Sequence, residues 1–279
     1  MHRVIKRTLL SPQVVRLEVE APRIARIRQP GQFVIVRLGE DRERVPLTIA
    51  DADPQAGTIS LVIQQVGKST TLLGNVQVGQ AIQDVVGPLG RAAHLERCAH
   101  AVCVGGGVGT AVVYPIAKAL ADAGTPVTAI IGGRTRQLVI LEDQMKAICR
   151  AVLVTTDDGS YGRKGLVTDA LKDLLSDADP PVGAVYAVGP VPMMKAAAEI
   201  TRPMGIKTVV SLNPIMVDGT GMCGGCRVSI DGKTRFACVD GPEFDGHQVD
   251  FDELADRLSM YRQQESQALE QCKLAGKLT

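Results

Sequence analysis

The stretch Ala101-Val-Cys-Val-Gly-Gly-Gly-Val-Gly109 decides the fold of this chain, because an apolar run typical of a buried strand leads directly into a glycine-rich loop. A helical pattern follows from Thr110 to Ala123, and Gly124 ends it. Backbone amides at the start of a helix that follows such a loop favour a phosphate group. The stretch is not a complete G-x-G-x-x-G motif, because Thr110 stands where the last glycine is expected.

The same order of strand, loop and helix continues downstream. Strand-like runs alternate with helical patterns, the strands at 127–131, 151–154 and 184–188 and the helices at 137–149, 164–177 and 192–202. This alternation predicts βαβ units and a Rossmann-like domain with a parallel sheet over residues 99–212. Two more strands end in glycine, at Gly132-Gly133 and Gly189-Pro190. Ligands bind at the carboxyl ends of such strands, so we expect a nucleotide there; tight turns that bind nothing are the alternative.

Residues 1–98 have a β pattern instead. Strand-like runs separated by turn residues, at 13–20, 32–38 and 58–64, predict a small antiparallel barrel. Two polar segments belong to it, Arg44-Val-Pro-Leu-Thr48 and Gly67-Lys-Ser-Thr-Thr71. The arginine suits bidentate binding of a diphosphate, and the lysine and hydroxyls of the second segment suit phosphate oxygens. Pro46 is expected to interrupt a central strand. Each segment taken alone also fits a charged rim of the barrel.

A glycine- and cysteine-rich module follows at 213–249. It contains Asp218-Gly-Thr-Gly-Met-Cys223-Gly-Gly-Cys226 and, further on, Cys238. With Asp218 in the place of a first cysteine, the spacing is that of a plant-type [2Fe–2S] cluster, C-x4-C-x2-C…C. The spacing therefore predicts Asp218, Cys223, Cys226 and Cys238 as ligands of the cluster. Structural zinc on the same four side chains, or buried cysteines that bind no metal, are the alternatives.

The last segment, 250–279, is expected to form one helix of about 20 residues and a loose tail. Asp250 or Asp252 would cap this helix, and Leu254, Leu258 and Tyr261 have helical spacing. The whole chain is thus predicted to be an α/β protein with an added β-barrel.

Composition excludes several classes of function. The 279 residues carry a net charge of +1, and aromatic residues make up 3%, which gives no field or stacking surface for nucleic acid. The longest uncharged stretch, 101–117, is too short to span a membrane, and the first residues lack the apolar core of a secretory signal. We therefore expect no nucleic-acid or membrane partner, and a cytoplasmic protein in which disulfides are unlikely to form.

Taken in order, these motifs resemble the ferredoxin–NADP⁺ reductase superfamily. The resemblance rests on Arg44-x-Pro-Leu-Thr48, Gly67-Lys68, Gly87-Pro-Leu-Gly90, Gly105-Gly-Gly-x-Gly109, Gly189-Pro190-x-x-Met193 and the cysteine module. The most similar branch pairs a flavin barrel with a C-terminal [2Fe–2S] loop. Within it, Asp218 is similar to the pattern of small subunits of NADH-dependent ferredoxin–NADP⁺ oxidoreductases, whereas dihydroorotate dehydrogenase-type subunits have four cysteines.

The resemblance implies two nucleotide cofactors and their sites. FAD would bind the barrel at Arg44, Pro46, Leu47, Thr48, Lys68, Ser69 and Thr70. NAD(H) would bind at Gly105, Gly106, Gly107, Gly109, Thr110, Arg134, Asp157, Asp158, Gly189, Pro190 and Met193. A carboxylate at 157 or 158 would repel a 2′-phosphate while Arg134 would attract one, and the balance favours NADH. No residue is expected to act as a catalytic acid or base, because hydride transfer to a flavin does not require one.

The resemblance also implies a function. The chain would pass electrons between NAD(H), FAD and the [2Fe–2S] cluster to a larger flavin and [4Fe–4S] subunit in a heterodimer, with ferredoxin reached through the complex and with electron bifurcation in the complex. Two alternatives stay open. One is a dihydroorotate dehydrogenase-type electron-transfer subunit, and the other is a zinc-stapled nucleotide-binding module without redox activity.

Overall fold

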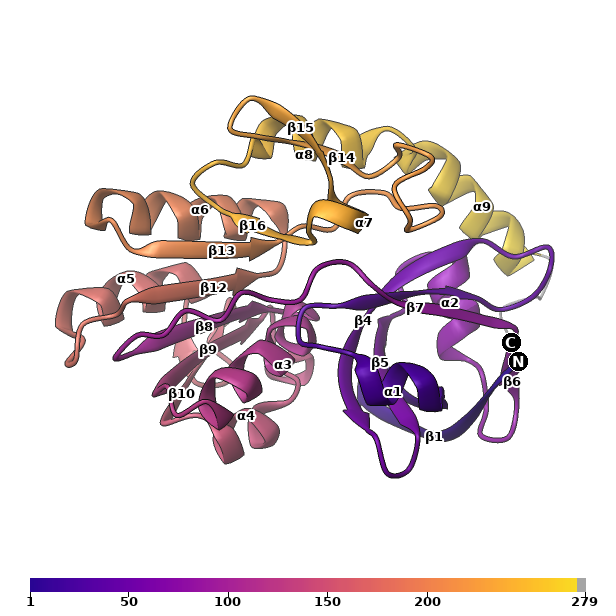
Figure 1. Ribbon diagram of the computed structural model, residues 1–279, viewed down its shortest axis with the longest axis horizontal. Coiled ribbons are helices and arrows are strands. Elements are labelled where there is room, and N and C mark those ends of the chain that lie inside the picture. Colours follow the sequence, from indigo (N-terminus) through magenta and orange to yellow (C-terminus); the bar gives the residue numbers. More distant parts are fainter. Residues whose placement is uncertain (275–279) are drawn as a thin grey trace.

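The computed structural model describes residues 1–274 and places two seven-stranded sheets side by side, with the C-terminal segment lying across both (Figure 1). The first sheet is antiparallel and curls into a nearly closed barrel, with strand order β6-β1-β2-β5-β4-β3-β7. Its strands are β1 (His2–Ser11), β2 (Val14–Glu20), β3 (Phe33–Arg37), β4 (Arg44–Asp53), β5 (Thr58–Gln64), β6 (Ala81–Ile82) and β7 (Asp84–Leu89). Two short helices accompany them, α1 (Pro22–Ile27) and α2 (Lys68–Gly74). The predicted barrel is confirmed.

The expectation that Pro46 interrupts a strand is wrong. Pro46 lies inside β4 and pairs with Ile35 of β3. On its other side β4 pairs with β5 only from Ile49 onward. The first half of β4 is therefore an edge on that side, where a residue without an N–H group removes no ladder hydrogen bond.

The second sheet is parallel except for its last strand, with order β11-β10-β9-β8-β12-β13-β16. Its strands are β8 (Ala101–Gly106), β9 (Val127–Gly133), β10 (Ala151–Thr156), β11 (Arg163–Lys164), β12 (Ala184–Val188), β13 (Lys207–Ser211) and β16 (Glu243–Asp245). The helices are α3 (Gly109–Asp122), η1 (Arg136–Leu138), α4 (Glu142–Ile148), α5 (Val167–Asp177), α6 (Val191–Thr201) and η2 (Arg202–Met204). Helices α3 and α4 cover one face, and α5 and α6 cover the other (Figure 1). The predicted parallel sheet is confirmed.

Two predicted helices differ in their limits. The pattern at 137–149 contains a short 3₁₀ turn and then α4, because Leu141 adopts a positive φ of 59° between them. Leu141 and its neighbour Ile140 are buried against the barrel, which explains why the chain turns there. The pattern at 164–177 starts later, at Val167, because residues 163–164 form the edge strand β11.

The C-terminal segment contains a hairpin, β14 (Arg227–Ile230) and β15 (Lys233–Phe236), and the helices α7 (Ala237–Asp240), α8 (Phe251–Ser259) and α9 (Arg262–Leu274). The prediction of one final helix is wrong, since α8 and α9 are separate. Asp250 caps α8 as predicted, accepting hydrogen bonds from the amides of Asp252 and Glu253. Leu254 is buried and Leu258 packs beside it, whereas Tyr261 is about half exposed. The chain turns where this contact ends, and α9 continues to α2 on the barrel.

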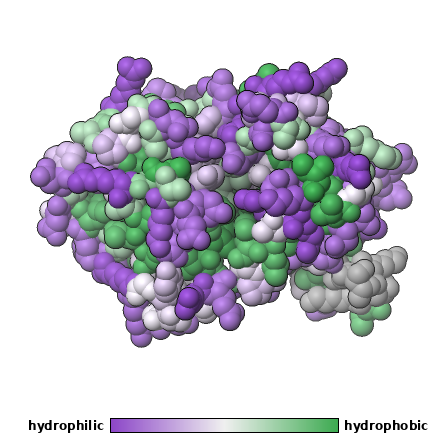
Figure 2. All heavy atoms as spheres, turned by 90° about the horizontal axis from the view of Figure 1, so that it is seen from below, coloured by the Kyte–Doolittle hydropathy of each residue, from purple (hydrophilic) through white to green (hydrophobic). Residues whose placement is uncertain are grey.

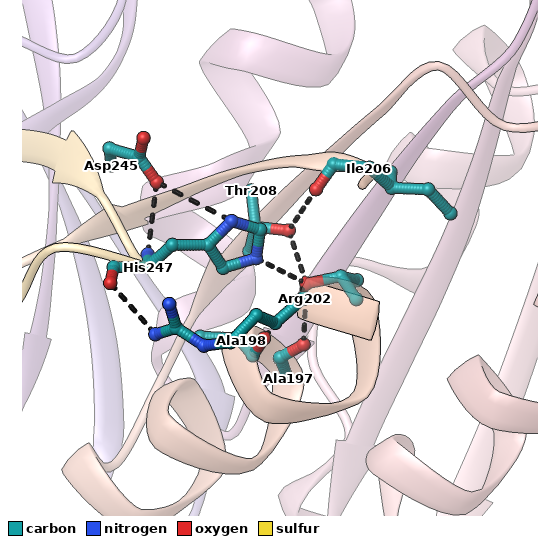
Figure 3. A network of polar contacts seen from close by, with 8 residues as sticks. Ala197, Ala198, Arg202, Ile206, Thr208, Asp245 and His247 are labelled. Atoms are coloured by element: carbon teal, nitrogen blue, oxygen red, sulfur yellow. Dashed lines mark hydrogen bonds and ion pairs between the residues drawn. The ribbon is translucent and has the colours of Figure 1, made fainter. Parts of the chain in front are cut away.

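A partly buried polar network ties the C-terminal segment to the nucleotide domain (Figure 3). His247 follows β16, and its Nε2 lies 2.9 Å from the hydroxyl of Thr201 at the end of α6. Thr208 of β13 donates to the same hydroxyl. Arg202 donates to the carbonyl of His247 at 2.7 Å. These bonds fix the strand that carries the chain away from the cysteine module.

Polar residues cover most of the surface seen from below, and apolar residues show toward the middle of that face (Figure 2). Within residues 1–274, no helix has both the length and the apolar character needed to cross a membrane.

Candidate functional site

Two glycine-rich loops meet where the order of the parallel sheet reverses. From β8 the chain moves outward to β9 and β10, and it later returns to β12 on the other side of β8. A Cβ atom at Gly106 would lie 2.5 Å from the sulfur of Met193 and 3.2 Å from Pro190. A Cβ atom at Gly109 would overlap the carbonyl oxygen of Val188. The two loops therefore pack closely against each other at a topological switch point, where folds of this kind bind a dinucleotide, and a Cβ atom at Gly107 would meet no protein atom within 4 Å.

Thr110 has a different place from the glycines around it. Its side chain is buried, and its hydroxyl lies 3.4 Å from the carbonyl of Gly105. The side chain thus closes the loop from inside, and we assign it a structural part in the site.

The charged residues predicted for the nucleotide lie together at the neighbouring strand ends. The amide of Asp157 donates to Gly133, and the amide of Asp158 donates to Arg134. The side chains of Arg134, Asp157 and Asp158 are all exposed. Hydrogen bonds from Ser160 hold the pKa of Asp158 below its usual value, so this carboxylate stays charged and is directed toward its own loop. Among residues 1–274, no hydrogen bond or ion pair holds the side chain of Asp157, which makes it the better candidate for ribose hydroxyls.

The structure adds two residues to this edge that the sequence did not indicate. The guanidinium of Arg136 lies over the ring of Tyr161 at 5.1 Å, a cation–π geometry. The hydroxyl of Tyr161 donates to Glu142 at 2.9 Å. Arg136 lies just before the helix predicted at 137–149, and nothing in that pattern marks it as a site residue. For Tyr161, the available signal was an aromatic residue in the loop that begins with Asp157 and Asp158.

On the barrel, the predicted flavin residues divide between two faces of β4. Arg44, Pro46 and Thr48 alternate along the strand and share its outer face, opposite Arg37, Ile35 and Phe33 of β3. Leu47 lies between them and packs against the barrel core. Its side chain therefore supports the strand from inside, and any contact with a flavin would come from its backbone.

The second polar segment meets the first in space. Ser69 at the start of α2 donates to the carboxylate of Glu43, the residue before Arg44. This contact brings together the segments that carry Lys68 and Arg44. Thr70 is used differently, because its hydroxyl accepts from the amide of Gly67 at 3.0 Å and closes the turn. Arg44 and Lys68 suit the diphosphate of FAD in charge.

The four predicted cluster ligands form two pairs. Cys223 Sγ lies 3.5 Å from Asp218 Oδ1, and Cys226 Sγ lies 3.1 Å from Cys238 Sγ. The first pair is at the surface, whereas Cys226 and Cys238 are each 1% exposed. A [2Fe–2S] cluster has two irons, each with two protein ligands, so this division fits it. Over residues 1–274, no three His, Cys, Asp or Glu side chains converge as a single-ion site.

Backbone amides support the sulfurs and the carboxylate. The amide of Gly225 donates to the sulfur of Cys223 at 3.4 Å, and the amide of Cys238 donates to the sulfur of Cys226 at 3.5 Å. Hydrogen bonds, chiefly from the backbone of Thr220, lower the pKa of Asp218. Asp218 is therefore present as a carboxylate, the form in which an oxygen ligand binds a metal.

The cluster loop packs on the same barrel face as the flavin residues. Phe33 and Ile35 of β3 form one apolar cluster with Cys226 and Cys238. A Cβ atom at Gly219, whose φ is +76°, would lie 2.7 Å from Ile35. Beside this contact is a cavity of about 380 Å³ whose lining includes both Arg44 and Asp218. One predicted flavin residue, Arg44, and one predicted cluster ligand, Asp218, thus line the same space.

Comparison with known proteins identifies three domains in this chain. Residues 1–94 match the oxidoreductase FAD-binding domain, 103–199 the oxidoreductase NAD-binding domain, and 213–250 the iron-sulfur cluster binding domain of dihydroorotate dehydrogenase B. A Thermotoga maritima protein described as a dihydroorotate dehydrogenase B (NAD(+)), electron transfer subunit homolog is 46% identical over 277 residues, 99% of this chain and 97% of that protein. The chain belongs to the family of dihydroorotate dehydrogenase B electron transfer subunits and their homologues.

Other members and a solved structure agree with this assignment. The electron transfer subunit of Geobacillus thermodenitrificans is 33% identical over 88% of this chain and 96% of its own length. A solved structure of the NADH-dependent reduced ferredoxin–NADP oxidoreductase, described for flavin-based electron bifurcation, contains a chain that is 46% identical. Each chain is covered to 97%, with a TM-score of 0.92. The resemblance inferred from the sequence is confirmed.

This family member is an oxidoreductase subunit with FAD-, NAD- and iron–sulfur-binding domains. The predictions of FAD, NAD(H) and an iron–sulfur cluster are confirmed at that level. The zinc-stapled alternative is set aside, because the cysteine module itself matches an iron–sulfur domain.

Proposed function

We propose that this chain is the electron-transfer subunit of an NADH-dependent reduced ferredoxin–NADP⁺ oxidoreductase, and that it passes electrons from NADH through FAD and a [2Fe–2S] cluster to a larger partner subunit. The observation that carries the proposal is the cavity lined by both Arg44 and Asp218. This cavity supports the proposal because a residue predicted to bind the flavin nucleotide and a predicted cluster ligand both line it. When bound, FAD and the cluster supply the change from two-electron to one-electron transfer.

The residues of this chain would orient and tune the cofactors. We propose that Arg44 and Lys68 neutralise the FAD diphosphate, and that Pro46 and Thr48 present the outer face of β4 to the flavin ring. We propose that Gly106, Gly109 and Gly189 let the two loops pack against each other, where a side chain would clash, and that these loops form the switch point at which the nicotinamide dinucleotide binds. The site needs no general acid or base.

The partner subunit would dock near the exposed half of the cluster loop. Asp218 and Cys223 lie at the surface there, and Met222 between them is 87% exposed. The homologues are described as electron transfer subunits, a role that requires another protein to accept the electrons. We propose a heterodimer whose larger subunit carries flavin and [4Fe–4S] clusters and reaches ferredoxin.

Anaerobic absorption and electron paramagnetic resonance spectra, recorded before and after NADH, test this proposal. The expected result is a flavin spectrum, acid-labile sulfide, and a reduced-cluster signal after NADH. Asp218→Cys should convert that signal to one typical of four thiolate ligands, while the matched change Asp256→Cys on the exposed face of α8 should leave it unaltered. A protein without flavin, or an Asp218→Cys signal identical to wild type, would contradict the proposal or the ligand assignment respectively.

A second candidate is the electron-transfer subunit of a dihydroorotate dehydrogenase, favoured by the match of residues 213–250 to that enzyme's iron–sulfur domain. Asp218 in place of a cysteine favours the first candidate. Purification of the native complex, followed by identification of the larger subunit, distinguishes the two.

A further inference from the structure

Glu243 lies where the three parts of the chain meet. It is the first residue of β16 and pairs with Ser211 at the carboxyl end of β13. A Cβ atom at Gly31, just before β3 of the barrel, would lie 2.6 Å from Glu243 Oε1 and 3.1 Å from the amide nitrogen of Ala93 in the linker. The barrel, the linker and the parallel sheet therefore close together around this carboxyl group.

The carboxyl group has no partner. Part of the residue reaches the surface, but both carboxyl oxygens are buried and neither has a hydrogen-bond partner in the described part of the chain. Burial alone raises the pKa of Glu243 to about 7. A buried carboxylate without a cation or a donor is costly, so burial shifts the balance toward the neutral acid, and near neutral pH both forms are accessible.

The surrounding groups do not supply a compensating charge. The barrel segment Gln29-Pro-Gly-Gln32 has no titratable side chain. The titratable groups on the other elements around the site are Cys103 of β8, Tyr186 of β12, His94 and Glu96 of the linker, and Asp245 of β16. Burial raises the pKa of both Cys103 and Tyr186, which keeps them neutral. Glu96 pairs with Lys207 and His94, and Asp245 accepts from the amide of His247.

Glu243 also lies close along the chain to the buried pair of cluster ligands. Cys238 precedes it by five residues, and the next residue, Phe244, packs with Cys226, Cys238 and Phe33 in one apolar cluster. Charges separated by such an interior are screened weakly. Added negative charge in this region would therefore favour the protonated form of Glu243.

We propose that Glu243 is a redox-linked proton-binding site. Its carboxylate takes up one proton from solvent when an electron enters the adjacent cofactor region, becoming a neutral carboxylic acid, and it returns the proton when the electron leaves. NADH is the source of the electron, so the inference rests on the function proposed above. Uptake of a proton at Glu243 would offset the negative charge of the added electron and so make reduction of the nearby cofactors more favourable.

Two measurements on the full chain with its cofactors test the inference. Infrared difference spectra between reduced and oxidised protein should contain a carboxylic-acid band that is absent in Glu243→Gln and present in the exposed control Glu199→Gln. Redox titration of the cluster at several pH values should show a potential that falls as pH rises near neutrality, by up to about 59 mV for a tenfold change in proton concentration. Glu243→Gln should flatten this dependence, and Glu199→Gln should not.

The outcomes separate the inference from the proposed function. A protein without a reducible cluster would contradict the function. A normal cluster signal whose pH dependence is the same in wild type and Glu243→Gln would overturn the proton site alone. If Glu243→Gln binds less flavin, Glu243→Asp provides the second variant, because it keeps a titrating group. A carboxylic-acid band displaced from its wild-type position in Glu243→Asp supports the assignment, and an unchanged band overturns it.

Discussion

Replacing Glu243 with glutamine should change how the stability of the protein depends on pH. The buried carboxyl has a pKa of about 7, against a usual value of 4.5. Since each pKa unit corresponds to about 1.4 kcal/mol, the proton that the folded state retains is worth about 3 kcal/mol. The group is deeply buried, so solvent screening reduces this value little.

The direction of this pH dependence follows from the raised pKa of Glu243. The folded chain holds a proton that the unfolded chain releases near pH 4.5, so this stabilisation is fully present below pH 4.5 and is lost as pH rises through about 7. Glutamine does not titrate. The free energy of unfolding of Glu243→Gln relative to wild type should therefore rise by about 3 kcal/mol between about pH 4.5 and about pH 8. A buried amide without partners adds a cost of about 1–3 kcal/mol, but it is the same at every pH.

Urea unfolding of both proteins at equal cofactor loading, followed by circular dichroism over this pH range, measures the difference. Glu199→Gln is the matched control, since Glu199 is exposed and its replacement should give a curve parallel to wild type. Parallel curves for wild type and Glu243→Gln would refute the reasoning, because they would show that Glu243 binds protons equally in the folded and unfolded chain.

Three further substitutions test other parts of the structure. Gly109→Ala places a methyl group on the carbonyl oxygen of Val188, so NADH affinity measured by fluorescence titration should fall at least about tenfold; unchanged affinity would refute the close approach of the two loops. Arg44→Ala should weaken FAD binding by about 1.5–3 kcal/mol, measured by flavin release, whereas Arg42→Ala in the exposed loop just before β4 should have little effect; equal effects would contradict a specific diphosphate contact. Tyr186→Phe removes a buried hydroxyl that bonds the linker backbone at 2.8 and 3.0 Å, and should lower the free energy of unfolding by about 1–3 kcal/mol; unchanged stability would show that the linker finds other partners.

Strands of the parallel sheet were the most predictable elements. The strand predicted at 184–188 is β12 with the same limits, because a fully buried strand between glycine-containing turns is apolar throughout. The last helix was less predictable. Its polar and apolar residues continue with helical spacing past Tyr261, but the break between α8 and α9 depends on where contact with the nucleotide domain ends.

The sequence predicted some parts of the candidate site better than others. Spacing alone was enough to propose Asp218 and the three cysteines, because a small loop must supply all cluster ligands locally. The side chains of Leu47 and Thr110 point inward because other parts of the chain cover that face of the strand or loop. The sequence motifs that contain these residues do not indicate which face is covered. Arg136 and Tyr161 come together from two different strand ends, so neither motif indicates the pair.

The sequence by itself determined the chemistry of this protein: the glycine loops after parallel strands, the cations of the barrel segments, and an Asp-Cys-Cys-Cys set with cluster spacing. These features depend on residue type over short distances, where spacing limits geometry. Only the tertiary structure decided that Arg44 and Asp218 line one cavity, and that Glu243 is buried without a partner. Both depend on segments that are far apart in the chain, and desolvation of a side chain is set by everything that packs around it.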